Sequence, residues 1–453
     1  MQIQPTGIFP VPAWGKSPHR VRSPHVVCAV LAIAAVIAPA HLAAQACPDP
    51  AALTRGFTQP LAAVRYLADD AMAGRQAGSA GERCAGDYIA RTFRELGLRP
   101  GGTADSFFQS VPLANILNPH VTGEGRNVIG ILPGGDPELR REFVIVGAHY
   151  DHLGTGGPGS LAPDRPGEIH NGADDNASGV AALLRIAQRL TDGPRPARSV
   201  LFVAFTGEES GLIGSARFAA DATIPKEAMV GMLNLDMVGR LGAQPLIVYG
   251  VATAEEWNVI LDPAAARAGI KLATRGEGYG PSDHTSFYSR DIPVLHFFTN
   301  VHGDYHRPSD DWDRIDAQGL DRVAALVADV AAGVANRRPA LTLLRGAGEP
   351  PRPAEPGARR GYGAYLGSVP DFTPVERGVK LSGVSPGSPA ERAAIRAGDV
   401  IVGLGRFDVT DLQALTDALT AHRPGDEVEV RLVRDRTQLT VRVTLGSRSA
   451  RDP

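Results

Sequence analysis

The stretch SVLFVAFTGEES, residues 199–210, gives the first indication of the fold, because an unbroken apolar run ends in two adjacent glutamates. A short apolar run of this kind is typical of a strand that is covered on both faces of a sheet. The carboxylates of Glu208 and Glu209 repel each other and resist burial in an apolar core. We therefore expect this strand to end at an opening in the core, where a cation relieves the repulsion.

Comparable strand-like runs and helix-like segments surround this stretch. Apolar runs occur at 127–134, 142–150, 229–239, 245–250 and 292–298. Segments with apolar residues at three- and four-residue spacing precede or alternate with them, at 61–75, 81–98, 178–190, 211–221, 254–269 and 320–336. This alternation predicts an α/β domain with a mixed, mostly parallel central sheet that helices flank.

Length and composition indicate a soluble protein with two folded domains. The chain has 453 residues, of which 43% are apolar and 21% are charged. Residues 47–337 hold the α/β pattern, and residues 338–360 are rich in Pro, Gly and Arg, as a linker is. Residues 361–448 carry short strand-like runs around two helical pieces, which predicts a second, smaller domain.

The charge of the chain argues against a polyanionic partner. It has 46 Lys and Arg against 49 Asp and Glu, so its formal net charge is −3. Lys and Arg nowhere form a block dense enough to neutralise a run of phosphates. We therefore expect no nucleic acid partner.

Residues 1–46 have the pattern of an export signal. A basic stretch at 15–25 precedes an apolar stretch at 26–40, and AQA at 44–46 has the small-x-small form of a cleavage site before Cys47. We predict that this signal peptide is cleaved and that the protein is periplasmic or secreted.

A membrane anchor and lipidation of Cys47 are the alternatives to a simple signal. The apolar run is interrupted at Pro39 and His41, and it is shorter than the roughly 20 residues that cross a bilayer. The residues before Cys47 also lack the aliphatic side chain that a lipoprotein signal usually offers. We expect no stable membrane span after signal cleavage.

Two cysteines would remain in the exported chain. Cys28 leaves with the signal, and Cys47 and Cys84 make an even count in an oxidising compartment, which suits a disulfide. Two unpaired thiols are the alternative, because bridging depends on a distance that the sequence does not give.

Acidic and histidine residues gather in five clusters at the ends of the predicted strands. The carboxyl ends of parallel strands line the crevice in which an open α/β sheet binds ligands, so these side chains can converge there. Singly, each has an ordinary explanation as a packed histidine, a helix cap or a solvated carboxylate. The residues that together predict one site are His149, Asp151, Asp174, Asp175, Glu208, Glu209, Asp236 and His306.

The donor types in these clusters predict zinc. Carboxylates in one crevice repel one another unless a cation neutralises them, and a mixed His/Asp/Glu set suits zinc better than calcium or magnesium. Two metals about 4 Å apart can share one carboxylate and one water. Asp151 can orient the ring of His149, because residues two apart on an extended segment point the same way. Of Glu208 and Glu209, one can bind metal while the other acts as general base.

With these clusters in this order, the chain resembles the co-catalytic dizinc aminopeptidases, which include secreted bacterial leucine-type aminopeptidases. The resemblance runs from about residue 62 to 337 and includes YLADDAMAGRQAGSAGERCAGDYIARTFRELGL at 66–98 and GRNVIGILPG at 125–134. It implies a zinc exopeptidase fold that holds two Zn²⁺ ions per chain and acts on peptide substrates.

The resemblance also implies a role for each residue of the site. Glu208 would be the general base for a hydroxide that bridges the two metals, and Asp151 would support His149. Asp175 rather than Asp174 would be the bridging ligand, because it lies directly before NASG. The ligands of the first zinc would be His149, Asp175 and Asp236, and those of the second zinc would be Asp175, Glu209 and His306.

Two further matches lie near the expected substrate site. Tyr305 matches a tyrosine whose phenol hydrogen-bonds the developing oxyanion in some family members, and a packed aromatic is the alternative. PSDHTSF at 281–287, with Asp283 and His284, recurs in the family near the substrate pocket. Glutaminyl cyclases, which are relatives, keep one zinc and lack the leading His-x-Asp cluster. Every ligand position is filled in this chain, which favours hydrolysis by two metals.

The C-terminal segment resembles a PDZ domain of the bacterial, protease-associated kind, a small β-sandwich or barrel-like fold with two helices. AYLGSVP at 364–370 stands where the carboxylate-binding loop would be, and the segment 382–415 is close to the family core. The backbone N–H groups of Leu366, Gly367 and Ser368 could receive a peptide C-terminus. A module that docks on the catalytic domain and binds no free ligand is the alternative.

These observations lead us to expect an exported dizinc metallo-exopeptidase that hydrolyses N-terminal residues from peptides, with a PDZ domain for peptide or partner binding. Two alternatives stay open. One is a zinc carboxypeptidase or amidase with the same fold, and the other is a peptide-binding scaffold that acts through its PDZ domain.

Overall fold

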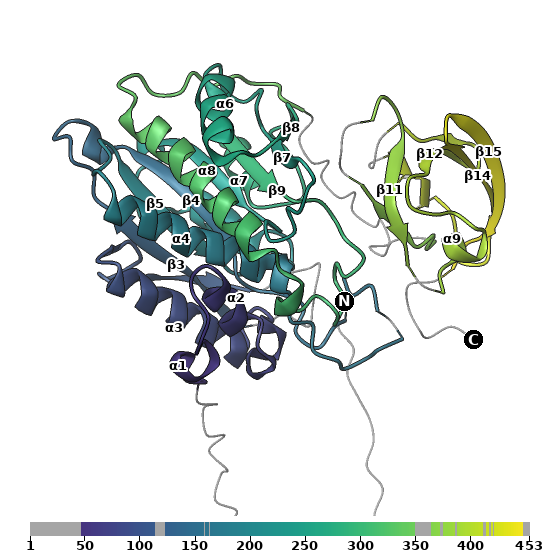
Figure 1. Cartoon of the computed structure of the whole chain (residues 1–453), viewed down its shortest axis with the longest axis horizontal. Helices are drawn as coiled ribbons and strands as arrows, with labels where there is room; N and C mark the ends of the chain where they lie inside the picture. The colour runs from purple at the N-terminus through teal and green to yellow at the C-terminus, as the bar shows by residue number, and fades with distance from the viewer. Residues whose placement is uncertain are drawn as a thin grey trace, which may run out of the picture. The chain divides into compact units, whose positions relative to one another are not determined.

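The computed structural model of the protein describes residues 47–113, 123–157, 159–162, 164–348, 364–371, 375–385, 387–410, 414–415, 418–419 and 421–446. The predicted signal peptide and residues 349–360 of the predicted linker lie outside the described residues. The described chain forms a nine-stranded sheet covered by helices and a six-stranded sheet (Figure 1).

The larger sheet has the mixed, mostly parallel form that the sequence predicts. Its strand order is β1-β3-β5-β4-β6-β9-β7-β8, with β2 beside β3. At its centre β5, β4, β6 and β9 run parallel, and β3 and β7 join on either side in the antiparallel direction. The strands are β1 (Arg99–Pro100), β2 (Phe108–Pro112), β3 (Glu124–Leu132), β4 (Phe143–His149), β5 (Ser199–Phe205), β6 (Met229–Leu235), β7 (Leu246–Tyr249), β8 (Leu272–Thr274) and β9 (Val294–Phe298).

Helices cover both faces of this sheet, which explains why its central strands are apolar throughout. Val144 and Val146 of β4 face the core that α2, α3, α4, α6 and α8 share, whereas Ile145 faces Phe218 of α5 and Phe287 of α7. Within the described ranges, no helix is both long and apolar enough to cross a bilayer. The helices are α1 (Pro50–Leu53), α2 (Leu61–Leu67), α3 (Ala80–Glu95), α4 (Gly179–Asp192), α5 (Ile213–Ala220), α6 (Trp257–Ala268), α7 (His284–Tyr288) and α8 (Ala317–Asn336), with short helical turns η1 (Asp70–Arg75), η2 (Leu139–Arg141), η3 (Ala173–Ser178), η4 (Lys226–Ala228) and η5 (Trp312–Arg314).

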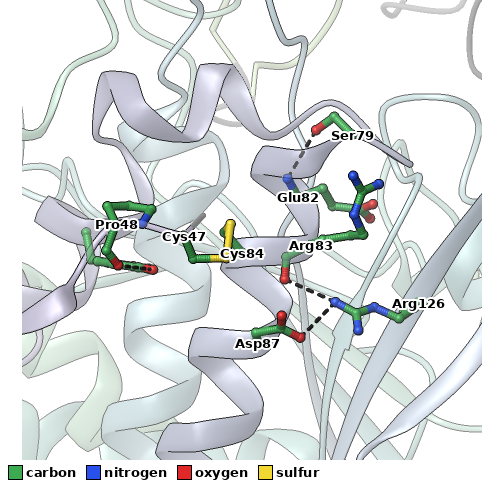
Figure 2. The surroundings of a disulfide bond; sticks show 9 residues. Cys47, Pro48, Ser79, Glu82, Arg83, Cys84, Asp87 and Arg126 are labelled. Carbon is green, nitrogen blue, oxygen red and sulfur yellow. Dashed lines mark hydrogen bonds and ion pairs between the residues drawn. A yellow bond between two sulfur atoms is a disulfide. The ribbon is translucent and has the colours of Figure 1, made fainter. Parts of the chain in front are cut away.

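Helix α3 begins at a capping box and is fixed to the sheet by an ion pair. Ser79 Oγ accepts the N–H of Glu82, and Glu82 Oε2 accepts the N–H of Gly78. Further along the helix, Arg126 of β3 donates to Asp87 at 2.9 Å (Figure 2). The helix therefore has a defined start and a fixed position on the sheet.

The structure joins Cys47 and Cys84 in a disulfide, which resolves the choice that the sequence left open. Their Cα atoms are 5.3 Å apart, within the usual range for such a bond, and their sequence separation is 37 (Figure 2). Because Cys84 lies on α3, the bond fastens the first described residue to a helix that packs on the large sheet.

The segment that follows α8 contacts the α/β domain. The N–H of Leu344 donates to the carbonyl of Thr253 at 2.9 Å, and the hydroxyl of Tyr288 donates to the carbonyl of Leu344 at 3.0 Å. Leu341 packs against the main core. Residues 341–344 of the predicted linker therefore lie against the domain that precedes them.

The C-terminal domain has its own antiparallel sheet and its own core. Its buried residues, among them Leu381, Ile401 and Val430, form one cluster between the sheet and α9 (Pro389–Arg392). The second predicted helix lies partly outside the described residues. The strands are β10 (Ser368–Pro370), β11 (Val379–Val384), β12 (Val400–Leu404), β13 (Phe407–Asp408), β14 (Glu427–Arg434) and β15 (Thr437–Thr444).

Removing the disulfide should lower the stability of the α/β domain. A bond that closes a loop of this size contributes about 3–4 kcal/mol by restricting the unfolded chain. We expect Cys84→Ser to lower the free energy of unfolding by about that amount, measured by urea denaturation in oxidising buffer. With reductant present, the wild type should fall to the level of the variant. Equal stability of the two proteins in oxidising buffer would contradict the role of the bond.

Candidate metal centre

The parallel centre of the large sheet brings the predicted site residues to one edge. Strands β4, β5 and β6 are neighbours that run in the same direction, so their carboxyl ends meet. His149 is the last residue of β4, Glu208 and Glu209 follow β5 after a short turn, and Asp236 directly follows β6. The loops before α4 and after β9 add the remaining two predicted ligands.

His149 presents one ring nitrogen to two carboxylates. Its Nε2 lies 3.4 Å from Oδ1 of Asp175 and 3.4 Å from Oδ1 of Asp236. Its Nδ1 lies 3.2 Å from the backbone carbonyl oxygen of Asp151 and 3.7 Å from the side chain of that residue. A ring held at one nitrogen and free to bind at the other is the usual arrangement of a metal-binding histidine.

His306 is arranged in the same way on the other side of Asp175. Its Nε2 lies 3.1 Å from Oδ2 of Asp175 and 3.3 Å from Oε2 of Glu209, and its Nδ1 lies 2.8 Å from the carbonyl oxygen of Gly159. The two carboxylate oxygens of Asp175 therefore face two different imidazoles. That is the geometry required of a carboxylate that bridges two metals.

The donor set fits two zinc ions. The structure contains two groups of three potential ligands, His149 with Glu208 and Asp236, and His152 with Asp175 and Glu209. Within each group the ligand atoms lie within 4.8 Å of one another. Imidazole nitrogens and carboxylate oxygens are the ligands that zinc takes beside thiolates. The buried Nε2 of His152 also has no hydrogen-bond partner in the described structure. The predicted metal ligands therefore lie close together, and Glu208 and His152 lie among them.

The adjacent glutamates have pKa values that move in opposite directions. Burial raises the pKa of Glu208 well above its ordinary value, and Asp236 adds to this although the charge of His149 opposes it. Burial also acts to raise the pKa of Glu209, but His306 and His152 outweigh it and lower that pKa to about 2. Glu209 is therefore a charged donor at neutral pH, whereas Glu208 can hold a proton.

Asp151 contacts the turn that carries Glu208. Its Oδ1 accepts the backbone N–H of Glu208 at 3.0 Å, while its Oδ2 is buried without a hydrogen-bond partner in the described structure. The sequence predicts that Asp151 supports His149, and the structure adds this bond to the neighbouring strand end. One carboxylate thus touches both β4 and the turn after β5.

His152 is the site residue that sequence reasoning missed. Its ring is buried, and its Nδ1 lies 2.7 Å from Oε1 of Glu209 and 3.9 Å from Oδ2 of Asp175. The signal was present in the sequence, because HYDHLG at 149–154 contains a second histidine three residues after the first. An imidazole bonded to a carboxylate in this way orients that carboxylate.

A cavity of about 120 Å³ opens beside this cluster. Histidines and acids form one wall, and the other wall includes Met237, Tyr249, Phe298 and Val301. Tyr305 also lines the cavity, and its ring centroid is 3.8 Å from that of His306. Burial and the nearby acids raise the pKa of Tyr305 well above its ordinary value, so its phenol keeps its proton at neutral pH.

The PSDHTSF segment lies behind the metal-site residues. Ser282 Oγ donates to Oδ2 of Asp236 at 2.7 Å, which fixes the second oxygen of that acid. The carboxyl group of Asp283 is buried, and burial raises its pKa to about 7. The ring of His284 lines the cavity and stacks on His296 with ring centroids 4.4 Å apart. This segment therefore touches both the ligands and the cavity.

The predicted carboxylate-binding loop of the second domain leads into β10. The carbonyl of Leu366 accepts the N–H of Ala390 at 2.9 Å, and the carbonyl of Gly367 accepts the N–H of Ser385 at 2.8 Å. Gly367 has a φ of +83°, and a Cβ there would lie 2.2 Å from Cβ of Ser388. The turn before Ser368 therefore requires glycine.

Two family models match the chain. Peptidase family M28 matches residues 127–331, a range that begins in β3, ends in α8 and includes every predicted metal ligand. The PDZ domain model matches residues 366–445, which begin at the predicted loop and end after β15.

The chain is also similar to individual proteins. A probable leucine aminopeptidase of Arthroderma otae is 29% identical over 212 residues, which cover 44% of this chain and 55% of that protein. Aminopeptidase YwaD of Bacillus subtilis is 29% identical over 213 residues, 45% of this chain and 43% of that protein. This chain therefore spans about half the length of these relatives. A solved aminopeptidase from Aneurinibacillus sp. strain AM-1 aligns with a TM-score of 0.48 and 20% identity, over 65% of this chain and 98% of that one.

The family matches agree with the site in their position along the chain. The M28 range contains the strand ends that hold the His, Asp and Glu cluster, and the PDZ range contains the second core. Residues 127–331 therefore belong to peptidase family M28, and residues 366–445 form a PDZ domain that follows them.

Proposed function

We propose that this chain is a dizinc aminopeptidase that removes N-terminal residues from peptides. The observation that carries the proposal is the position of Asp175, whose two oxygens face His149 and His306 respectively. The M28 match supports a metallopeptidase, and the relatives that share this part of the chain are named as aminopeptidases.

Five residues would hold the two ions, and Asp175 would belong to both sets. Zinc ions bound there would supply positive charge that polarises a peptide carbonyl group and makes water more acidic. His152 would orient Glu209 through its 2.7 Å contact. The ligands in this proposal are His149, Asp175 and Asp236 for one ion and Asp175, Glu209 and His306 for the other.

Glu208 would move the proton that the reaction requires. Its raised pKa lets it accept a proton from the attacking water and then pass it to the amine that leaves. The bond from its N–H to Asp151 holds the backbone of the turn in place during this transfer. Tyr305, which is neutral and lines the cavity, can donate its O–H to the oxyanion that forms.

The cavity favours substrates with an apolar first residue. Met237, Tyr249, Phe298 and Val301 offer apolar surface to a substrate side chain. Burial lowers the pKa of His296 in the same cavity to about 4, so its ring is uncharged at neutral pH and attracts no acidic side chain. We propose leucine-like or aromatic residues as the preferred N-terminal group.

Export and peptide binding by the second domain are part of the same proposal. The basic and apolar stretches before Cys47 support export to the periplasm or the medium, and the disulfide of Cys47 and Cys84 suits an oxidising compartment. The PDZ domain would receive a peptide C-terminus at Leu366, Gly367 and Ser368.

A panel of substrates tests the proposal directly. We expect the purified protein to release p-nitroaniline from leucyl-p-nitroanilide, to leave N-acetylated peptides intact, and to lose activity with a chelator and regain it with Zn²⁺. Cleavage from the C-terminus of N-acetylated peptides would instead support the carboxypeptidase alternative. A protein with two bound zincs that cleaves none of these substrates would refute the proposal.

Substitution of the two glutamates should separate their roles. Glu208→Gln should bind two zincs normally and lower kcat by about 10²–10⁴-fold, because the proton acceptor is lost. Glu209→Gln should lower the zinc content itself, because a ligand charge is removed. Metal analysis by mass spectrometry and steady-state kinetics would measure both effects, with Glu227→Gln on the exposed η4 as the control. Equal zinc loss in both site variants would contradict the assignment.

Metal binding should release protons. Burial by itself would lower the pKa values of His149 and His306. The nearby acids, Glu208 for His149 and Glu209 for His306, outweigh burial and raise both pKa values well above the ordinary value. The metal-free rings are therefore protonated at neutral pH, and zinc must displace these protons, so zinc affinity should fall as the pH falls. Calorimetric titration with Zn²⁺ at pH 7, in buffers of different ionisation enthalpy, should report release of about two protons. Binding without proton release would show that the rings are neutral.

A further inference from the structure

The turn at 171–175 carries the ligand that both metals would share. It enters η3 through Gly172, whose φ of +56° only glycine adopts readily, and a Cβ there would lie 2.1 Å from the carbonyl oxygen of Asp175. The turn therefore folds back closely on itself. Its shape sets where the carboxylate of Asp175 points.

Arg75 binds the carbonyl side of this turn. The side chain is fully buried at the end of η1 and donates to the carbonyl oxygens of Asn171 at 2.6 Å and Gly172 at 3.0 Å. It also donates to the carbonyl of Tyr150 at 3.0 Å, beside His149. One guanidinium thus connects the turn to the end of β4. Burial lowers the pKa of Arg75 to about 10, so it stays charged at neutral pH.

Asp310 binds the amide side of the same turn. Its buried Oδ2 accepts the N–H groups of Asp174 at 2.9 Å and Asp175 at 3.1 Å, and its backbone carbonyl accepts the N–H of Ala173 at 3.1 Å. Its other oxygen accepts from Arg240 at 2.9 Å, which compensates its charge. A cation therefore holds the carbonyl groups at the start of the turn, and an anion holds the amides at its end.

We propose that Arg75 and Asp310 are a pair of positioning residues that shape the turn at 171–175, so that the carboxylate of Asp175 stands between His149 and His306 before any metal binds. The inference rests on the proposed function in taking Asp175 as the bridging ligand. Neither residue contacts substrate or metal in this role. They act through the backbone of the turn, and the property that they change is the affinity of the site for metal.

The alternative is that both residues only stabilise the fold. Control variants separate the two roles, because the chain offers a buried arginine and a partly buried aspartate that also bind backbone groups elsewhere. Arg198 is also fully buried and donates to the carbonyls of Val334 and Arg338, and Asp316 accepts the N–H groups of Gly242 and Gly319. The side chains of these controls make no hydrogen bond to the turn at 171–175.

The experiment compares zinc affinity in the full-length protein. We expect Arg75→Lys and Asp310→Asn each to weaken zinc binding by about 10–100-fold in competition with a chelator, as loss of an outer hydrogen-bond partner of a metal ligand does. Arg198→Lys and Asp316→Asn should lower the melting temperature of the metal-free protein and leave zinc affinity unchanged. Because both residues hold one turn, their effects should not be independent. The fold-loss of zinc affinity in the double variant should be smaller than the product of the fold-losses in the two single variants.

Two results would overturn the inference. One is a folded Asp310→Asn variant that binds zinc with the affinity of the wild type. This substitution keeps the shape of the side chain, so its result decides whether the inference holds even if Arg75→Lys does not fold. The other is an equal loss of affinity in the control variants. The proposed function fails separately, because a wild type that binds two zincs and cleaves no peptide would refute the peptidase but leave the role of the turn measurable.

Discussion

Mutual repulsion among buried carboxylates is the constraint on which this site depends. Asp175, Glu208, Glu209 and Asp236 crowd the carboxyl ends of parallel strands, where each is buried or only partly exposed. Such a group is tolerated only where positive charge or directed hydrogen bonds compensate it. In the protein chain itself, imidazoles and the hydroxyl of Ser282 provide part of that compensation, and the metals would provide the rest. The surrounding helices, strands and turns hold these acids close together.

Much of the fold follows from apolar patterning, because buried parallel strands have a strong signature. The runs around Val144, Leu201 and Leu233 predict the central strands, and β4, β5 and β6 occur there. Strands β1, β2 and β8 were not predicted. Strands of two or three residues, such as Arg99–Pro100 and Leu272–Thr274, are too short to show a periodic pattern. Their pairing also depends on strands that are distant in sequence.

The candidate site was partly predictable for a different reason. The predicted ligands follow strands, so topology alone brings them together, and the structure places all of them around Asp175. His152 was missed because its direction depends on the path of the loop after β4 rather than on strand alternation. Arg75 and Asp310 were beyond sequence reasoning, since their bonds go to backbone atoms about 100 and 135 residues away in the chain. Nearly every residue type has the same backbone N–H and carbonyl groups, so a bond to the backbone cannot be predicted from residue identity.

The shared carboxylate of Asp175 has a thermodynamic consequence. When one ligand serves two ions, occupancy at either position changes the charge and direction of the donor left for the other. The two positions are then reciprocally coupled, and the factor by which the first ion alters the affinity for the second is the same in either order of addition. Two ions bound in this way would form one linked equilibrium, and a change at either end of the turn would affect both.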